Sequence, residues 1–470
     1  METTENTLKA EIDGIYQTQK AHQHLVKQSN AVERIQKLIK LKNSILLHKE
    51  EVMDALQADF GKPAFESLTT EVLVLVNEID FACQNLATWM KPIETASALN
   101  PIAKGKIIYE PKGVVLIIGP WNFPFILLLS PLIPTIAAGN TAVLKPSELT
   151  PSVSNAIKKI IEDCFNQNEV AVIEGGIEAT TEILKVPFDH IFFTGSPKVG
   201  KIVMAAAAKN LASVTLELGG KSPVIIDSTA ELDKAVHRVI RGKTLNAGQI
   251  CMGPDYLLIA EPLKDLFIQK AKELIEKTLF KNGTFEEQDF AQIINQQNFD
   301  RLQSLFDDAV AKGANVALGG IFDQAGRRIQ PTILTNVPLD STLMKEEIFG
   351  PILPVFTYKS KEEVVDFVRQ FDKPLSYYIF SADQHMIDYL IDNSSSGGVA
   401  VNDIMLQAFD ENLPFGGVNG SGTGNYHGIY GFRELSHAKG VFIQSSETPV
   451  DEFGQQPYNG KVKALLEKLS

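Results

Sequence analysis

The chain has 470 residues, a formal net charge of −13, and a composition of 44% hydrophobic and 21% charged residues. This length is too great for one typical core, so we expect a globular protein with at least two lobes. The acidic balance, with no cluster of Lys and Arg along the chain, argues against a nucleic-acid partner, because binding a phosphate backbone requires a basic surface.

The three cysteines, Cys83, Cys164 and Cys251, are widely spaced. Their odd number prevents complete pairing and no CxxC spacing is present, while His22 and His24 lack a third ligand, so we expect no metal site. Such cysteine usage is typical of a reducing compartment. The N-terminal METTENTLKAEIDG also lacks the pattern of a signal peptide. We therefore expect a cytoplasmic protein.

The first part of the chain, from about Thr7 to Asn85, is expected to be helical because its apolar residues recur at three- and four-residue spacing. Residues 113–144 follow without a single charge, and that length is enough to span a bilayer. Four prolines interrupt the segment, however. It is better interpreted as a buried strand VVLIIG, a proline-rich loop, a core helix and a strand TAVLK, so we expect no membrane span.

Two series of short β-branched runs follow, each alternating with stretches that can form helices. The first series is VVLIIG, TAVLK, VAVIEGG, HIFFTGS and SVTLELGG. The second is PVIID, YLLIA, NVALGG, PTILT, ILPVFTY, YYIFS and GGVAVN. The alternation predicts βαβ units, and hence two open α/β lobes in series with their junction near LELGGKSP. Ligands of such folds bind at the carboxyl ends of the strands and between lobes.

Several chemically useful residues stand where these strands should end. They are Asn122, Lys145, Glu148, Gly195, Ser196 and Glu217. On pattern alone, Lys145 could equally be a solvated turn residue and Glu148 a helix cap. The run GSPKVG lacks the GxGxxG spacing but could open a helix whose amides meet a phosphate. The glycine-rich run at 416–424 follows no convincing strand, and we interpret it as a tight surface or inter-lobe loop.

Glu217 and Cys251 each allow two interpretations. A carboxylate in the apolar strand VTLELGG could be a general base with a raised pKa, or a buried partner of Lys221. Cys251 in NAGQICMGPDY could be a packed thiol or a nucleophile, and the flanking Gly248 and Gly253 would let a ligand approach its backbone. No HExxH, GxSxG or GxxxxGK[ST] motif is present, so the zinc-hydrolase, serine-hydrolase and P-loop readings lack their central residues.

Taken together, these pieces resemble the aldehyde dehydrogenase superfamily over nearly the whole chain. The matching segments, in the family's order, are PWNFP (120–124), KPSE (145–148), FTGSPKVG (193–200), LELGGKSP (216–223), GQIC (248–251), EEIFGP (346–351) and LPFGGVNGSG (413–422). The length, CMGPDY and the YHG at 426–428 are most similar to the class 3 branch, which takes medium-chain, fatty and aromatic aldehydes and includes coniferyl aldehyde dehydrogenases.

The resemblance implies a covalent mechanism. Cys251 matches the nucleophile that forms a thiohemiacetal and then, after hydride transfer, a thioester. Asn122, with the Cys251 backbone N–H, matches the oxyanion donor, and Glu217 matches the base that activates the hydrolytic water. Glu347 is a second candidate for that base. Gly253 stands where class 3 members more often have alanine.

The resemblance also implies a nicotinamide cofactor. Lys145 and Glu148 match residues that grip the adenosine ribose, Ser196 matches a pyrophosphate contact, and Glu347 and Phe349 match residues that orient the nicotinamide. The full set of expected cofactor contacts is Trp121, Lys145, Glu148, Gly195, Ser196, Gly200, Leu218, Glu347 and Phe349. Glu148 favours NAD, because a carboxylate repels a 2′-phosphate, although class 3 enzymes often accept NADP.

The implied architecture is α/β, with two open doubly wound lobes and a small β oligomerisation flap. We expect an NAD(P)-binding domain at 1–88 and 110–217, a catalytic domain at 218–415, a bridging element at 89–109 and 416–445 that builds a homodimer, and a C-terminal tail at 446–470. Two other functions remain open, which are acyl transfer to coenzyme A and non-catalytic binding. The presence of Glu217 argues against the first, and an intact nucleophile, base and oxyanion donor argue against the second.

Overall fold

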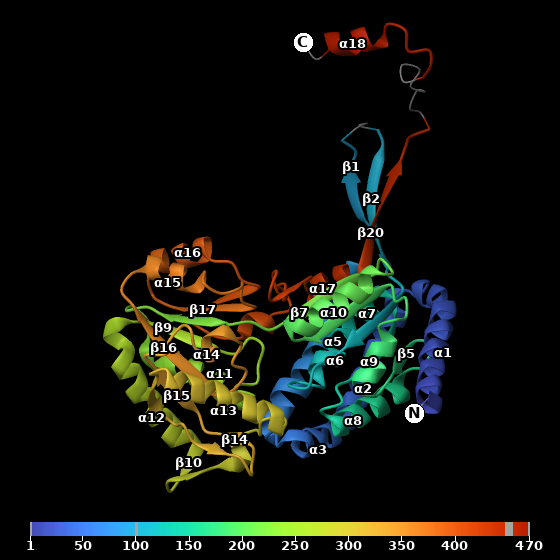
Figure 1. Ribbon diagram of the computed structural model, residues 1–470. Helices are drawn as coiled ribbons and strands as arrows, with labels where there is room; N and C mark the ends of the chain where they lie inside the picture. The colour runs from blue at the N-terminus through green and yellow to red at the C-terminus, as the bar shows by residue number, and fades with distance from the viewer. Residues whose placement is uncertain (1, 99–101, 447–454, 469–470) are drawn as a thin grey trace. The chain divides into compact units, whose positions relative to one another are not determined.

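The computed structural model describes residues 2–98, 102–446 and 455–468. The chain divides into two compact units, one formed by residues 1–89 and 110–437 and the other by residues 90–109 and 438–470 (Figure 1). The boundaries proposed from the sequence for the cofactor, catalytic and bridging domains stay a prediction. The predicted C-terminal tail falls partly outside the described residues.

The N-terminal part of the larger unit is helical, as its apolar periodicity predicts. The helices are α1 (Glu2–Lys27), α2 (Ala31–Leu47), α3 (Lys49–Phe60), α4 (Ala64–Ser67), the π-helical turn η1 (Leu68–Val72) and α5 (Leu73–Trp89). Asn30 starts α2 with a capping box, because its side chain accepts the Glu33 N–H while the Glu33 carboxylate accepts the Asn30 N–H.

The first sheet has the strand order β19-β7-β6-β3-β4-β5. Its strands are β3 (Val114–Ile118), β4 (Thr141–Lys145), β5 (Val170–Val172), β6 (His190–Gly195), β7 (Ser213–Leu218) and β19 (Gly422–Thr423). The helices between them are α6 (Ile126–Leu129), α7 (Leu132–Ala138), α8 (Pro151–Cys164), α9 (Ile177–Ile183) and α10 (Pro197–Ala208). All neighbours are parallel except β19, which is antiparallel to β7. From β3, the chain adds β4 and β5 on one side and then β6 and β7 on the other, so the strand order switches between β3 and β6. Open α/β sheets bind ligands at such a switch point.

The second sheet has the order β12-β15-β16-β9-β8-β17-β18. Its strands are β8 (Pro223–Ile226), β9 (Tyr256–Ala260), β12 (Asn315–Leu318), β15 (Thr332–Thr335), β16 (Ile352–Tyr358), β17 (Ser376–Phe380) and β18 (Gly398–Val401). Its helices include α11 (Leu232–Thr244), α12 (Lys264–Leu279), α13 (Gln296–Ala311), α14 (Thr342–Lys345), α15 (Lys361–Val368) and α16 (Gln384–Asn393). Only β12 pairs antiparallel, and the central strands β8, β9 and β17 are buried throughout. The two predicted α/β lobes are therefore confirmed.

The smaller unit contains a sheet of β1 (Ile93–Ala96), β2 (Lys104–Pro111) and β20 (Ser436–Ile443), in the order β1-β2-β20. The pairing of β1 with β2 is antiparallel. A short helix, α18 (Lys461–Glu467), follows in the tail. This sheet confirms the predicted β flap as an element of the fold.

The uncharged segment 113–144 folds as β3, α6, α7 and β4, which agrees with its interpretation from the sequence. Among the described residues, no helix has the length and apolar character needed to cross a bilayer. The helix before Cys251, α11, ends at Thr244, and Asn246 in the following turn adopts a left-handed backbone. One local expectation was wrong. The glycine-rich run at 416–424 is not only a loop, since it supplies β19 beside β7.

Candidate active site

The loop that carries Cys251 begins with an unusual turn, η2 (Leu245–Gly248), between α11 and β9. Asn246, Ala247 and Gly248 all adopt left-handed φ values, of 51°, 51° and 72°. This conformation costs an L-residue about 1 kcal/mol or more, so the surrounding structure must hold it in place. At Gly248 an added Cβ would lie 2.5 Å from the Gly350 carbonyl oxygen, and only glycine fits there.

Buried amide side chains hold this turn. The Gln249 side chain donates to the carbonyls of Asn246 (3.1 Å) and Gln292 (3.0 Å) and accepts the Ile294 N–H (3.0 Å). The Asn246 amide donates to the Asn122 carbonyl (2.9 Å). Both polar atoms of the Gln249 side chain are thus used in fixing the loop, which explains why a polar residue stands two positions before Cys251.

A second turn follows immediately. The Gly253 N–H donates to the Ile250 carbonyl (2.9 Å), which closes a turn around Cys251. A Cβ at position 253 would lie 3.1 Å from that carbonyl, so alanine would fit only after a small shift of the backbone. Cys251 as a whole residue is half-buried.

Asn122 lies beside this loop although it comes from the first sheet. It follows β3, is only 3% exposed, and donates from its side-chain nitrogen to the Gln249 carbonyl (3.0 Å). A primary amide has two N–H groups, so this bond fixes the amide plane and leaves the second N–H for another acceptor. The structure therefore brings Asn122 and Cys251 to one place, as the sequence predicted.

Glu217 lies in β7, where it is 4% exposed, and neither of its carboxyl oxygens has a hydrogen-bond partner among the described residues. Burial, and next the charge of Glu434, raise the pKa of Glu217 well above its usual value. The alternative that Glu217 pairs with Lys221 is wrong. The Lys221 ammonium instead bonds Asp255 (2.9 Å) and the Glu346 carbonyl (2.8 Å).

Glu347 follows α14, and its carboxyl group lies close to Gly219, in the segment that joins β7 of the first sheet to β8 of the second. A Cβ on Gly219 would collide with the Glu347 carboxyl group, so glycine at 219 permits this approach. Burial and the Asp255 charge raise the pKa of Glu347 to about 8, although the Gly220 N–H partly opposes the shift. One Glu347 oxygen has no hydrogen-bond partner within the described part of the chain.

The charges of Glu347 and Glu217 affect the pKa of the Cys251 thiol. Burial raises the pKa of Cys251 to about 12, and the charges of Glu347 and Glu217 add to that shift. The backbone N–H groups of Met252 and Cys251 lower it in part. A buried thiol, two carboxyl groups with raised pKa values and a carboxamide thus share one site, and such clusters mark catalytic centres.

The candidate ribose site lies at the end of β4. Lys145 is almost fully buried, donates to the Pro146 carbonyl (2.6 Å), and has its ammonium 3.8 Å from the half-exposed Glu148 carboxylate. Burial lowers the pKa of Lys145. A donor and an acceptor side by side at a strand end suit the vicinal hydroxyls of a ribose.

The candidate phosphate site lies at the start of α10. Ser196 caps the helix by accepting the Val199 N–H (3.4 Å), and it follows Gly195, the last residue of β6. At Gly200 an added Cβ would lie 2.7 Å from the Leu218 side chain, so glycine lets α10 pack closely on the end of β7. An exposed helix N-terminus beside a switch point suits a pyrophosphate.

The candidate nicotinamide site joins residues from both sheets. The Trp121 and Phe349 rings meet edge to face, with centroids 5.3 Å apart and planes at 77°. Phe349 has a left-handed φ of 51°, and Arg301 donates to the neighbouring Ile348 carbonyl (2.8 Å). This support holds Glu347 and Phe349 together beside the loop of Asn122, so these residues fit a nicotinamide ribose and ring.

Cys251 also lines a narrow cavity of about 60 Å³. Its walls are mainly apolar and include Val74, Phe123, Ile126, Leu127, Met405 and Phe409. The sequence did not single out these residues, because they come from α5, the loop after β3, α6 and the segment after β18, and an apolar side chain in any of these elements is expected from packing alone. An apolar cavity ending at a thiol suits an uncharged substrate.

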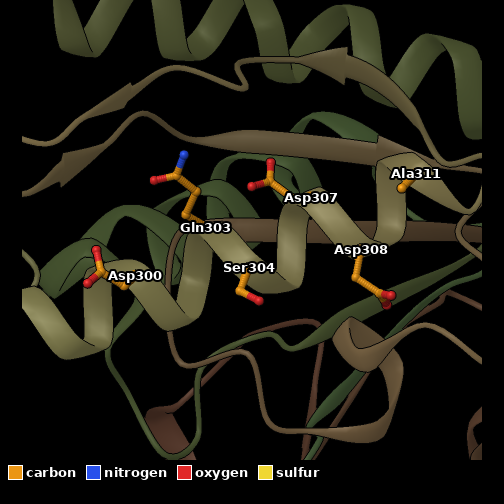
Figure 2. Close-up of a pocket in the computed structure, with 6 residues that line it drawn as sticks. All are labelled: Asp300, Gln303, Ser304, Asp307, Asp308 and Ala311. Atoms are coloured by element: carbon orange, nitrogen blue, oxygen red, sulfur yellow. The ribbon is translucent and has the colours of Figure 1, made fainter.

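A second hollow lies along α13 and has no such chemistry. Figure 2 shows that Asp300, Gln303, Ser304, Asp307 and Asp308 project from this helix. Asp308 is engaged in accepting the Thr342 N–H (2.7 Å). In the described ranges, no group of three or more His, Cys, Asp or Glu side chains could hold a metal ion. The chemistry therefore concentrates around Cys251.

Comparison with known proteins gives the same class. The sequence profile of the aldehyde dehydrogenase family matches residues 1–441. A putative aldehyde dehydrogenase, AldX, of Bacillus subtilis is 48% identical over 94% of this chain and 100% of its own length. The 4,4'-diaponeurosporen-aldehyde dehydrogenase of Staphylococcus aureus is 44% identical, covering 92% of this chain and 93% of that protein. Aldehyde dehydrogenase family 3 member A2 of Macaca fascicularis is 42% identical, covering 88% and 84%.

Solved structures agree with these relatives. The substrate-bound state of Staphylococcus aureus AldH superposes with a TM-score of 0.91 at 41% identity, covering 98% of this chain and 99% of that one. The Methanocaldococcus jannaschii glyceraldehyde-3-phosphate dehydrogenase GapN, complexed with NADP, has a TM-score of 0.84 at 29% identity, covering 93% and 95%. The betaine aldehyde dehydrogenase of Staphylococcus aureus, in complex with NAD+, has a TM-score of 0.85 at 26% identity, covering 95% and 90%.

The fold and these relatives define a nicotinamide-dependent dehydrogenase. The chain belongs to the aldehyde dehydrogenase family. The resemblance to the class 3 branch is confirmed by the relatives at 42–48% identity. Its activity is accordingly the NAD(P)-dependent oxidation of an aldehyde.

Proposed function

We propose that the protein oxidises medium- or long-chain aliphatic or aromatic aldehydes to carboxylic acids, using Cys251 as the nucleophile and Glu217 as the hydrolytic base. The observation that carries the proposal is the position of Cys251, which lines an apolar cavity and has Asn122 and two carboxyl groups beside its loop. An apolar wall favours aliphatic and aromatic substrates over charged ones, because burying an unpaired charge is costly.

The proposed first step is attack of the Cys251 sulfur on the aldehyde carbon. A carbon–sulfur bond forms, the carbonyl π electrons move to oxygen, and the thiol proton leaves for a nearby carboxylate. The second N–H of the Asn122 amide and the Cys251 backbone N–H stabilise the oxyanion. Lys145, Glu148 and the start of α10 would hold a nicotinamide cofactor, which would supply the hydride acceptor needed to oxidise the adduct to a thioester.

Glu217 is the better candidate for the hydrolytic base. Its carboxyl oxygens have no hydrogen-bond partners among the described residues, so they are available to take a proton from water. Glu347 is restrained by the Gly220 N–H and by attraction to Lys221. In the proposed hydrolysis, water adds to the thioester carbon, its proton passes to Glu217, and the carbon–sulfur bond breaks to release the acid.

Replacing Glu217 by Gln tests the assignment. The expected result is a normal burst of one reduced cofactor per active site, followed by a steady-state rate about 10²–10⁴-fold lower, because only hydrolysis needs the base. Intact-mass spectrometry should then find the acyl group on Cys251. Full steady-state turnover by Glu217→Gln, with the same defect in Glu347→Gln, would transfer the role to Glu347. Turnover by Cys251→Ala would overturn the mechanism.

The cofactor preference that we propose is NAD, with NADP as a weaker alternative. The supporting feature is the Glu148 carboxylate beside Lys145 at the end of β4. A carboxylate there accepts a 2′-hydroxyl and repels a 2′-phosphate. We also propose that the protein works in the cytoplasm, which is supported by its three unpaired cysteines.

We further propose a homodimer and retain the domain division given by the sequence. Support comes from each unit separately. In the larger unit, α10 and the residues after it expose the apolar side chains of Val199, Ile202, Met204 and Leu211. In the smaller unit, β20 exposes Phe442 and Ile443. Exposed apolar side chains grouped on one element are typical of interfaces.

A further inference from the structure

A buried ion pair lies beneath the loop that carries Asn122. Lys62, which follows α3, and Glu71, in η1, are both 0% exposed, and the Lys62 ammonium donates to one Glu71 oxygen (2.6 Å). The other Glu71 oxygen accepts the N–H groups of Phe125 (3.0 Å) and Ile126 (3.1 Å). Glu71 thereby holds the start of α6, whose first N–H groups have no partner within the helix.

Lys62 also contacts this loop, through the ring of Phe123. Its ammonium lies 3.8 Å from the centroid of the Phe123 ring, a cation–π distance. Phe123 is the residue after Asn122, and Phe125 and Ile126 follow it. The ion pair therefore contacts the loop directly after Asn122 and again two residues later. The Asn122 side-chain nitrogen itself donates to the Gln249 carbonyl. The ion pair therefore holds the backbone after Asn122, while this bond holds its carboxamide.

The burial of this ion pair indicates that it orients the loop rather than adds to the stability of the fold. Removing two charges from water is costly, and apolar residues of similar volume often stabilise a core equally well. A fully buried pair that also bonds two backbone groups instead specifies one loop conformation. Glu71 lies in a π-helical turn, a form found mostly as single turns at functional sites.

We propose that Lys62 and Glu71 are positioning residues for the oxyanion donor Asn122, a role that rests on the proposed function of Asn122. The pair fixes the backbone from Phe123 to Ile126, and this fixes where the free N–H of Asn122 points. Neutralising either member leaves the other charge buried and unpaired, and the loop then relaxes. Only steps that develop an oxyanion should suffer.

The matched control is an equivalent arrangement at the opposite end of β3. Asp189 accepts the Val114 N–H (2.8 Å) and pairs with Lys20 (2.8 Å), as Glu71 accepts the loop N–H groups and pairs with Lys62. Asp189→Asn and Glu71→Gln therefore make the same chemical change near the two ends of β3, and only Glu71 lies next to the loop of Asn122. The Lys20–Asp189 pair is partly exposed, whereas the Lys62–Glu71 pair is fully buried.

Two rates measured on the full-length enzyme test the proposal. One is the single-turnover rate of cofactor reduction by an aldehyde, which requires an oxyanion. The other is the rate of alkylation of Cys251 by iodoacetamide, measured by mass spectrometry. This alkylation forms no oxyanion. Glu71→Gln should slow the first about 10- to 100-fold, within the range for loss of an oxyanion donor, and leave the second within about twofold. Asp189→Asn should leave both rates nearly unchanged.

A double-mutant cycle with Asn122→Ala separates positioning from general destabilisation. If Glu71 acts through Asn122, the double variant should be no slower than Asn122→Ala alone. Additive losses, or equal slowing of alkylation, would overturn the role of the pair. An unimpaired Asn122→Ala would overturn the proposed role of Asn122 itself. If Glu71→Gln does not fold, Lys62→Met with Glu71→Leu removes both buried charges, and full single-turnover activity in that variant would contradict the proposal.

Discussion

At the scale of single residues, the surroundings of Cys251 make its resting thiol a weak nucleophile. Burial, Glu347 and Glu217 together raise its pKa to about 12, so the thiolate is scarce at neutral pH. Glu347, with a pKa of about 8, is mostly neutral near pH 7, and burial also raises the pKa of Glu217 above its usual value. Cys251 therefore loses its proton during the catalytic cycle rather than in the resting enzyme.

The pH dependence of Cys251 alkylation follows from these values. Below the thiol pKa of about 12, the iodoacetamide rate in the free enzyme should rise with pH through pH 10. Glu347 has a pKa of about 8, so it is neutral below that pH and charged above it. Glu347→Gln should therefore change the rate little at pH 6 and increase it at pH 9–10. Cys251→Ala gives the background, and a plateau below pH 8 would contradict the raised thiol pKa.

Glu148 should set the choice of cofactor. Two charges about 4 Å apart in water interact by about 1 kcal/mol, so removing the carboxylate should raise kcat/KM for NADP relative to NAD by about fivefold. The comparison is Glu148→Gln against wild type with both cofactors. Glu174→Gln is the matched control, because Glu174 also acts on Lys145 but is paired with Lys158 (3.1 Å). An unchanged ratio in Glu148→Gln would refute the ribose assignment.

At the scale of elements, the left-handed turn before Cys251 can be tested with two glycines. Gly248 (φ 72°) faces the Gly350 carbonyl, whereas Gly283 (φ 81°) has open space around it. Alanine at 283 should cost about 1 kcal/mol of unfolding free energy from its conformation alone. Alanine at 248 should cost about 2 kcal/mol more and reduce kcat, because the clash moves the nucleophile loop. Equal costs in denaturant melts would show that the contact with Gly350 is unimportant.

The same turn shows where sequence reasoning stops. The strands were predictable because apolar β-branched runs are recognisable from a few neighbouring residues. Asn122, Cys251 and Glu217 were selected as candidates through their motifs, and their roles stay a prediction. Ala247 in a left-handed conformation has no such signal, because its backbone is imposed by contacts with distant residues. The strand β19 was missed for a similar reason, since Gly422 pairs with Glu217 across about two hundred positions. Lys62 and Glu71 are nine residues apart across a π-helical turn, and no helical periodicity connects them.

At the scale of the whole molecule, the open question is how many chains form the working enzyme. Each chain carries a formal charge of −13, so association must overcome repulsion that salt screens. The apolar side chains on α10 supply a favourable term, because burying apolar surface drives association. A homodimer of this kind should therefore dissociate more readily at low ionic strength.

Replacing Ile202 by Glu should weaken the proposed dimer. Ile202 is 55% exposed in the middle of α10, and a charge there would be buried without a partner on association, which raises the dissociation constant at least about tenfold. Sedimentation velocity over a concentration series measures the shift. Ile177→Glu is the control, because Ile177 is 79% exposed at the start of α9, away from the apolar group on α10. If both variants sediment like wild type at every concentration, α10 is not the interface, and the exposed Phe442 and Ile443 of β20 become the surface to change next.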